Sequence, residues 1–67
     1  MGRDERAAII RVRVLSAVGA GYRSIPEIAR HSRLPPCIVA GALLSLELDD
    51  RVGSYVFRGD ERFYLVR

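Results

Sequence analysis

The sequence has no lysine and no tryptophan, and its 67 residues include a single cysteine and five aromatic residues. Cys37 has no partner for an internal disulfide, and no Cys/His cluster could hold a structural metal. With so few aromatic rings, the core must be aliphatic. Because 67 residues lie near the lower limit for a self-sufficient hydrophobic core, we expect one domain over 1–67 that dimerises to complete its core.

The sequence lacks the features of a membrane protein and those of an enzyme. Its apolar runs are too short to span a bilayer, and acidic residues occupy the N-terminus where a signal peptide would have none. We therefore expect a cytoplasmic protein without a membrane partner, associated with the nucleoid if it binds DNA. The sequence has no nucleophile–base pair, glycine-rich phosphate loop or paired carboxylates, so we expect no enzyme, no cofactor and no small-molecule substrate.

The charge is mildly basic and unevenly placed. The net charge is +3 with a pI of about 9.8, and all eleven basic residues are arginine. Arginine favours bidentate contacts to phosphate or carboxylate, although a GC-rich coding sequence explains the bias equally well. The segments 1–21, 22–34 and 51–67 each carry +2, whereas 35–50 carries −3. The basic charge therefore surrounds residues 35–50.

Residues 4–18 are predicted to form a first helix. Asp4 and Glu5 lie at its positive end, and Gly19 or Gly21 would end it. Its apolar residues form two stripes. The first contains Ala7, Ile10, Val14, Ala17 and Val18, and the second contains Ala8, Val12 and Leu15. One monomer core uses one stripe, so the other needs a partner.

The spacing of Ser24 and Glu27 is that of a capping box, which predicts a second helix over 25–31. A turn over 31–34 follows it. A pair of prolines, Pro35 and Pro36, then begins a third helix over 36–48, because proline is pre-organised for the first helical positions. Two helices across a turn of a few residues are typical of a helix-turn-helix.

The third helix has a core face and an outward face. The core face is predicted to hold Val39, Ala42, Leu43 and Leu46. The outward face is predicted to hold Cys37, Gly41, Leu44 and Ser45. We expect Leu48 to turn inward at the C-terminal end of the helix.

Residues 52–66 are predicted to form a β-hairpin with a tight turn at Gly59-Asp60, which pairs Arg58 with Glu61. In that pairing, Val52, Val56, Phe63 and Leu65 share one face. The other face carries Tyr55, Phe57, Tyr64 and Val66. Because a half-exposed hairpin should be apolar on one face only, we expect either a different register or a second chain covering the outer face.

The run Ser24-Ile25-Pro26-Glu27-Ile28-Ala29, followed by Leu34-Pro35, by Ala42 to Leu48 and by Val52, resembles a winged helix-turn-helix domain. It is similar in particular to the small winged helices of bacterial DNA-processing protein A and to compact archaeal and bacterial transcription regulators. The resemblance extends from the second helix through the hairpin. It implies a mostly helical α+β fold, in which three helices precede a two-stranded wing.

The resemblance also implies which residues would meet double-stranded DNA. Ser24 matches a phosphate-contacting helix cap, and Ser32 and Arg33 lie in the turn. Cys37, Gly41, Leu44 and Ser45 match the face that enters the major groove, and Arg58 and Arg62 flank the wing tip. This chain departs from the pattern because its reading face has no Arg, Lys, Asn or Gln to bond purine edges.

The residues and the resemblance allow two alternative functions, and the sequence does not decide between them. The first is a double-stranded DNA-binding protein, a small transcription regulator or chromatin-type binder held mainly by phosphate contacts. The second is a winged helix that binds proteins or dimerises without binding DNA. For a homodimer, the candidate interfaces are the first helix, with Ile9, Val12 and Leu15, or the outer hairpin face, with Tyr55, Phe57 and Tyr64.

Overall fold

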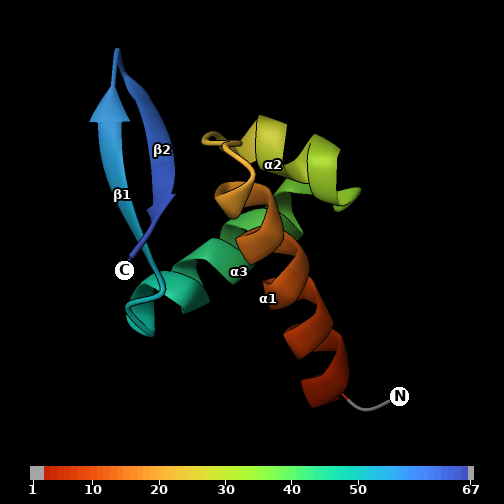
Figure 1. Ribbon diagram of the computed structural model, residues 1–67. Coiled ribbons are helices and arrows are strands. Elements are labelled where there is room, and N and C mark those ends of the chain that lie inside the picture. The colour runs from red at the N-terminus through yellow and green to blue at the C-terminus, as the bar shows by residue number, and fades with distance from the viewer. Residues whose placement is uncertain (1–2, 67) are drawn as a thin grey trace.

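The computed structural model describes residues 3–66; Met1, Gly2, Arg67 and the side chains of Arg3 and Asp4 lie outside the described part. The elements are α1 (Arg3–Gly19), α2 (Ile25–Ser32), α3 (Pro36–Leu48), β1 (Val52–Phe57) and β2 (Asp60–Leu65). The hairpin stands on one side of the helices, and α1 extends away from it on the other (Figure 1). This arrangement confirms the predicted α+β winged helix-turn-helix. Among these helices, none combines the length and the apolar character needed to cross a bilayer.

The core is aliphatic apart from one ring, Phe63, and it joins all three helices to the base of the hairpin. It comprises Val14, Ala17, Val18, Ile28, Ala29, Val39, Ala42, Leu43, Leu46, Val52 and Phe63. The predicted core face of α3 and most of the first stripe of α1 are therefore confirmed. Leu48 was predicted wrongly, because it is 79% exposed. It lies two residues beyond Leu46, which is about 200° around the helix, so its side chain points away from the core.

The capping box at the start of α2 is present as predicted. The Ser24 hydroxyl donates to the Glu27 carboxylate at 2.8 Å and accepts from the Glu27 backbone N–H at 3.4 Å. The hydrogen bond from the Ser24 side chain is the main cause that lowers the pKa of Glu27 below its ordinary value, and the positive charge of Arg62 adds to it. The Ser24 backbone N–H donates to the same carboxylate at 3.4 Å, so two backbone donors at the start of α2 are satisfied.

We expect Ser24→Ala to lower the free energy of unfolding by about 1 kcal/mol, as is usual when a helix N-cap is removed. The pKa of Glu27 should rise at the same time, because its main hydrogen bond is gone. A lowered folded-state pKa stabilises the protein above the ordinary value of about 4.5, and that stabilisation disappears as the pH falls through the folded-state pKa. The difference in stability between parent and variant should therefore shrink in acid.

The measurements are denaturant unfolding from neutral to acidic pH and an NMR titration of the Glu27 side chain. Ser16→Ala is the matched control, because Ser16 is an exposed serine within α1. An unchanged Glu27 pKa in Ser24→Ala would contradict the assigned cause.

The hairpin turn lies one residue earlier than predicted. Phe57 pairs with Asp60, so the turn is formed by Arg58 and Gly59 instead of Gly59 and Asp60. Arg58 has a φ of 53°, and Gly59 has a φ of 82°. A two-residue turn with positive φ at both positions is of type I′, in which glycine favours the second position. This preference places Gly59 second and sets the register.

The corrected register differs from the predicted one by two residues, so each side chain keeps its predicted face. Val52 and Phe63 are buried on the inner face. Tyr55, Phe57 and Tyr64 are exposed on the outer face, which confirms that both faces of the hairpin are apolar.

The connection between α1 and α2 is bonded to the hairpin. The Phe63 backbone N–H donates to the Arg23 carbonyl at 2.8 Å, and the Arg23 guanidinium donates to the Phe63 carbonyl at 3.2 Å. Arg23 thus lies along the free edge of β2. These bonds join residues forty positions apart, and nothing in the local sequence around Arg23 predicts them.

Candidate nucleic-acid interface

The outward face of α3 is open and uncharged. Cys37, Gly41 and Leu44 are exposed, and Leu44 leaves 61% of its surface uncovered. A Cβ added at Gly41 would meet no atom within 4 Å, so the space next to the helix backbone is open there. Without a bidentate donor, this face can meet DNA only through apolar contacts, such as Leu44 with a thymine methyl, and through close backbone approach.

The row Cys37, Gly41 and Ser45 lies at the edge of that face, beside α1. With Ile10 and Arg11 of α1, these residues line a recess of about 280 Å³. Ser45 is half-buried as a result, so the prediction that it faces outward is corrected. Residues four apart in sequence differ by about 40° around a helix. Along α3, the row therefore turns from the open side at Cys37 towards α1 at Ser45. Leu44 is the member of the predicted reading face that points freely outward.

The turn between α2 and α3 supplies one exposed side chain and one buried one. Ser32 was predicted to contact DNA, but it is buried, and its hydroxyl donates to the Ile28 carbonyl one turn earlier. That prediction is wrong, because a serine ending a short helix can satisfy its hydroxyl within the helix. Arg33 is exposed and takes the left-handed conformation that ends α2, with a φ of 58°.

Ser24 is half-buried, and its hydroxyl already has a partner. That partner is the Glu27 carboxylate, which is charged at neutral pH and whose pKa this hydrogen bond lowers further. A phosphate approaching Ser24 would therefore meet a negative charge. The capping box weakens the case for Ser24 as a phosphate contact.

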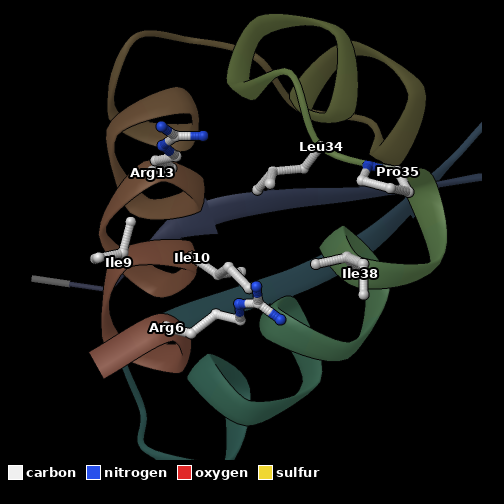
Figure 2. A pocket seen from close by; sticks show the side chains of 7 residues that line it. All are labelled: Arg6, Ile9, Ile10, Arg13, Leu34, Pro35 and Ile38. Atoms are coloured by element: carbon white, nitrogen blue, oxygen red, sulfur yellow. The ribbon is translucent and has the colours of Figure 1, made fainter. Parts of the chain in front are cut away.

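Arg33 lies with α1 and not with the hairpin. It lines a recess with Val12, Arg13 and His31, at the end of α2 that points away from the hairpin in Figure 1. Arg13 also borders a neighbouring groove of about 360 Å³ between α1 and the start of α3. Figure 2 shows Ile10, Leu34 and Ile38 converging in that groove.

The same groove holds a second arginine of α1, Arg6 (Figure 2). Arg6, Arg13 and Arg33 therefore form a basic edge along α1 and the turn. The sequence analysis named neither Arg6 nor Arg13 as a site residue. Their seven-residue spacing, two helical turns, is the signal that places both on one side of α1.

The wing tip carries the second basic group. The Arg58 and Arg62 guanidinium carbons lie 5.3 Å and 5.2 Å from the centre of the Phe57 ring. Both distances are within the range of a cation–π contact. The predicted arginines of the wing are thus brought together on one ring, at a distance from Arg33.

The wing is also tied to α3. The Ser54 hydroxyl donates to the Glu47 carboxylate at 3.4 Å, which links the middle of β1 to the last turn of α3. Near the same end of α3, Arg11 forms an ion pair with Asp49. Within the described part of the chain, no three His, Cys, Asp or Glu side chains gather to hold a metal ion.

Comparison with known proteins agrees with this fold. A family model described as the DprA winged helix domain matches residues 4–55. The fold is similar to that of the apo-Zalpha domain of zebrafish PKZ, with a TM-score of 0.84 and 22% sequence identity over 92% of this chain and 98% of that one. A search of curated proteins finds no match.

Proposed function

We propose that this chain, which belongs to the family of DprA winged helix domains, binds double-stranded DNA through α3 and the wing. The observation that supports the proposal is a helix-turn-helix formed by α2 and α3, in which Leu44 of α3 is exposed. Beside it stands a hairpin whose tip carries two arginines. Phosphate contacts supply most of the affinity in such a complex, and the helix in the major groove contributes the contacts to the bases. The role would be that of a small transcription regulator or a chromatin-type binder.

The charges support phosphate contacts at two places. Arg58 and Arg62 lie at the wing tip, and Arg33 lies at the turn before α3, so the duplex would be contacted by two separate groups of arginines. Because the outward face of α3 is apolar, discrimination among sequences should be modest and should depend on DNA shape.

We expect binding to a mixed-sequence duplex to weaken as salt rises, with a slope of roughly −0.9 for each phosphate contact in a plot of log affinity against log salt. An Arg58→Ala/Arg62→Ala variant should bind all sequences more weakly and flatten the slope by about one unit for each arginine replaced. Arg33→Ala should weaken binding further and independently. Gel-shift titrations over a salt series measure these effects.

Arg51→Ala is the matched control, because Arg51 is an exposed arginine at the base of the hairpin and not at its tip. A folded Arg33/Arg58/Arg62 triple alanine variant that binds duplex as tightly as the parent at low salt would refute the contact assignment. A parent protein that binds no duplex at low ionic strength would leave protein interaction as the function.

We infer as a second proposal that the chain forms a homodimer through α1. Val12 is 64% exposed on α1, and Ile9 is exposed one turn before it, on a domain close to the lower size limit for a stable core. Leu15 already packs partly against the core of its own chain, so Val12 would be the centre of the interface. A two-fold axis would bring the same stripe of both copies together.

Light scattering at tens of micromolar should therefore give the mass of a dimer. Val12→Glu should give the monomer mass, because it places a charge at the centre of the interface. Val56→Glu is the control, since Val56 is also well exposed but lies on the hairpin. A monomer mass for the parent that does not change with concentration would contradict the proposal.

A further inference from the structure

Three aromatic rings lie on one exposed surface of the hairpin, which we call the outer wing face. It consists of Tyr55 and Phe57 on β1 with Arg62 and Tyr64 on β2. The rings are exposed by 43%, 48% and 42% for Tyr55, Phe57 and Tyr64. The core lies against the opposite face, where Val52 and Phe63 are buried, so these rings have no structural role in the core.

Tyr55 and Tyr64 form a platform, with Phe57 next to it on β1. The centres of Tyr55 and Tyr64 are 6.1 Å apart, with a tilt of 42° between the ring planes. Phe57 follows Tyr55 by two residues on the same strand face, a step of roughly 7 Å. The Tyr64 ring lies directly over Gly53, because a Cβ added there would overlap the ring atoms. The glycine thus lets Tyr64 lie across β1 beside Tyr55.

Positive charge flanks both ends of the platform. Arg58 and Arg62 lie against the Phe57 ring near the turn. At the other end, Arg23 and Tyr64 line a recess of about 230 Å³. Asp60, the partner of Phe57, is the one carboxylate that the two strands place on this face. The face therefore combines planar rings with guanidinium groups along its length.

We propose that the outer wing face binds single-stranded nucleic acid, with unpaired bases stacked on Tyr55 and Tyr64 and the backbone phosphates beside Arg58 and Arg62, which lie against Phe57. Stacking on aromatic side chains, together with a positively charged track, is how proteins hold single strands without reading their sequence. Bases within a duplex are stacked on one another and cannot lie on these rings. The site shares Arg58 and Arg62 with the proposed duplex contacts, but its two tyrosine rings are not among those contacts, so the rings can be tested separately.

Tyrosine fluorescence offers a direct measurement. The chain has no tryptophan, and two of its three tyrosines lie on the platform. The third, Tyr22, lies in the connection between α1 and α2 and stacks on His31 of α2, with ring centres 4.3 Å apart. Titration with an oligothymidylate of about 12 nucleotides, within the usual site sizes, should quench tyrosine emission until the site is filled. An oligouridylate of equal length shows whether DNA and RNA strands bind alike.

Tyr55→Ala and Tyr64→Ala should each weaken single-strand binding by about tenfold, measured by anisotropy of a labelled oligonucleotide. Tyr55→Phe keeps the ring and should bind like the parent, as should Tyr22→Phe away from the platform. Gly53→Ala keeps every ring and charge but displaces Tyr64 from its place over β1, so it should also bind more weakly. Melting curves establish that each variant is folded.

Three results would overturn the proposal. One is the absence of quenching by either oligonucleotide at low salt. Another is equal single-strand affinity for the parent and the two alanine variants. The third is a dimer mass that falls to the monomer mass in Tyr55→Ala and Tyr64→Ala, because a second copy would then cover the face. Duplex binding by the same variants is the separate readout, and it should stay at the parent level whether or not single strands bind.

Discussion

Leu43→Ala is expected to lower the free energy of unfolding by about 2–5 kcal/mol, the range observed when a buried leucine is truncated. Leu43 is 1% exposed and lies between the other helices and the base of the hairpin. The truncation gives up apolar burial and leaves a cavity that neighbouring side chains fill only in part. A domain of 67 residues has little stability to spare, so the variant should be largely unfolded at physiological temperature.

Leu44→Ala is the matched control, because it removes the same atoms from the next position of the same helix. The Leu44 side chain points into solvent, so the free energy of unfolding should fall by well under about 1 kcal/mol. Thermal melts followed by circular dichroism compare the two variants. Equal shifts in melting temperature would mean that the rotation of α3 is misassigned, and the proposed reading face would then be wrong as well.

Phe63→Ala is expected to cost about 3–5 kcal/mol, which is typical of a buried phenylalanine. Phe63 is 2% exposed and is the only aromatic ring of the core among the described residues. It also stands where β2 meets the connection between α1 and α2, through the hydrogen bond of its backbone N–H to the Arg23 carbonyl. Truncating it should loosen the hairpin from the helices as well as open a cavity.

Phe57→Ala provides the comparison on the opposite face of the same hairpin. Phe57 is half exposed and contacts two arginine side chains at the tip, so its truncation should cost much less stability. Denaturant titrations at equal protein concentration give both free energies. A cost for Phe57→Ala as large as that for Phe63→Ala would show that the outer face packs against something, such as a second chain.

Much of the fold could be predicted because its signals are local. The capping box of Ser24 and Glu27 and the proline pair before α3 mark helix starts within a few residues of sequence. The core face of α3 follows from helical periodicity, because Val39, Leu43 and Leu46 recur on one side. These patterns depend on neighbouring residues alone, so no knowledge of distant contacts is needed.

The errors arose where the outcome depends on tertiary contacts or on a choice between similar local conformations. The hairpin turn could be drawn at either of two positions that share Gly59, and the preference for glycine at the second position decided between them. Ser32 looked like a turn residue, but the position of α2 against the core buries it. Ser45 was turned from the solvent by the packing of α1, which a helical wheel of α3 alone does not contain.

The candidate site was predictable in its residue types but not in its grouping. Arg58 and Arg62 were expected near the tip, yet their shared contact with Phe57 depends on the register. The basic edge along α1 and the turn requires the packing of α1 beside that turn. Arg23 became part of a binding surface only through its pairing with β2.

That pairing bears on how the chain folds. The bond between the Arg23 carbonyl and the Phe63 amide closes a loop of forty residues that contains α2, α3 and β1. Closing a long loop costs chain entropy that is recovered only when distant contacts form. The helical pair α2 and α3 and the hairpin of β1 and β2 each have a short connection, so both can form from local contacts. We therefore expect the docking of the hairpin at Arg23 to be a late step of folding, so that the surfaces proposed to bind nucleic acid are completed only then.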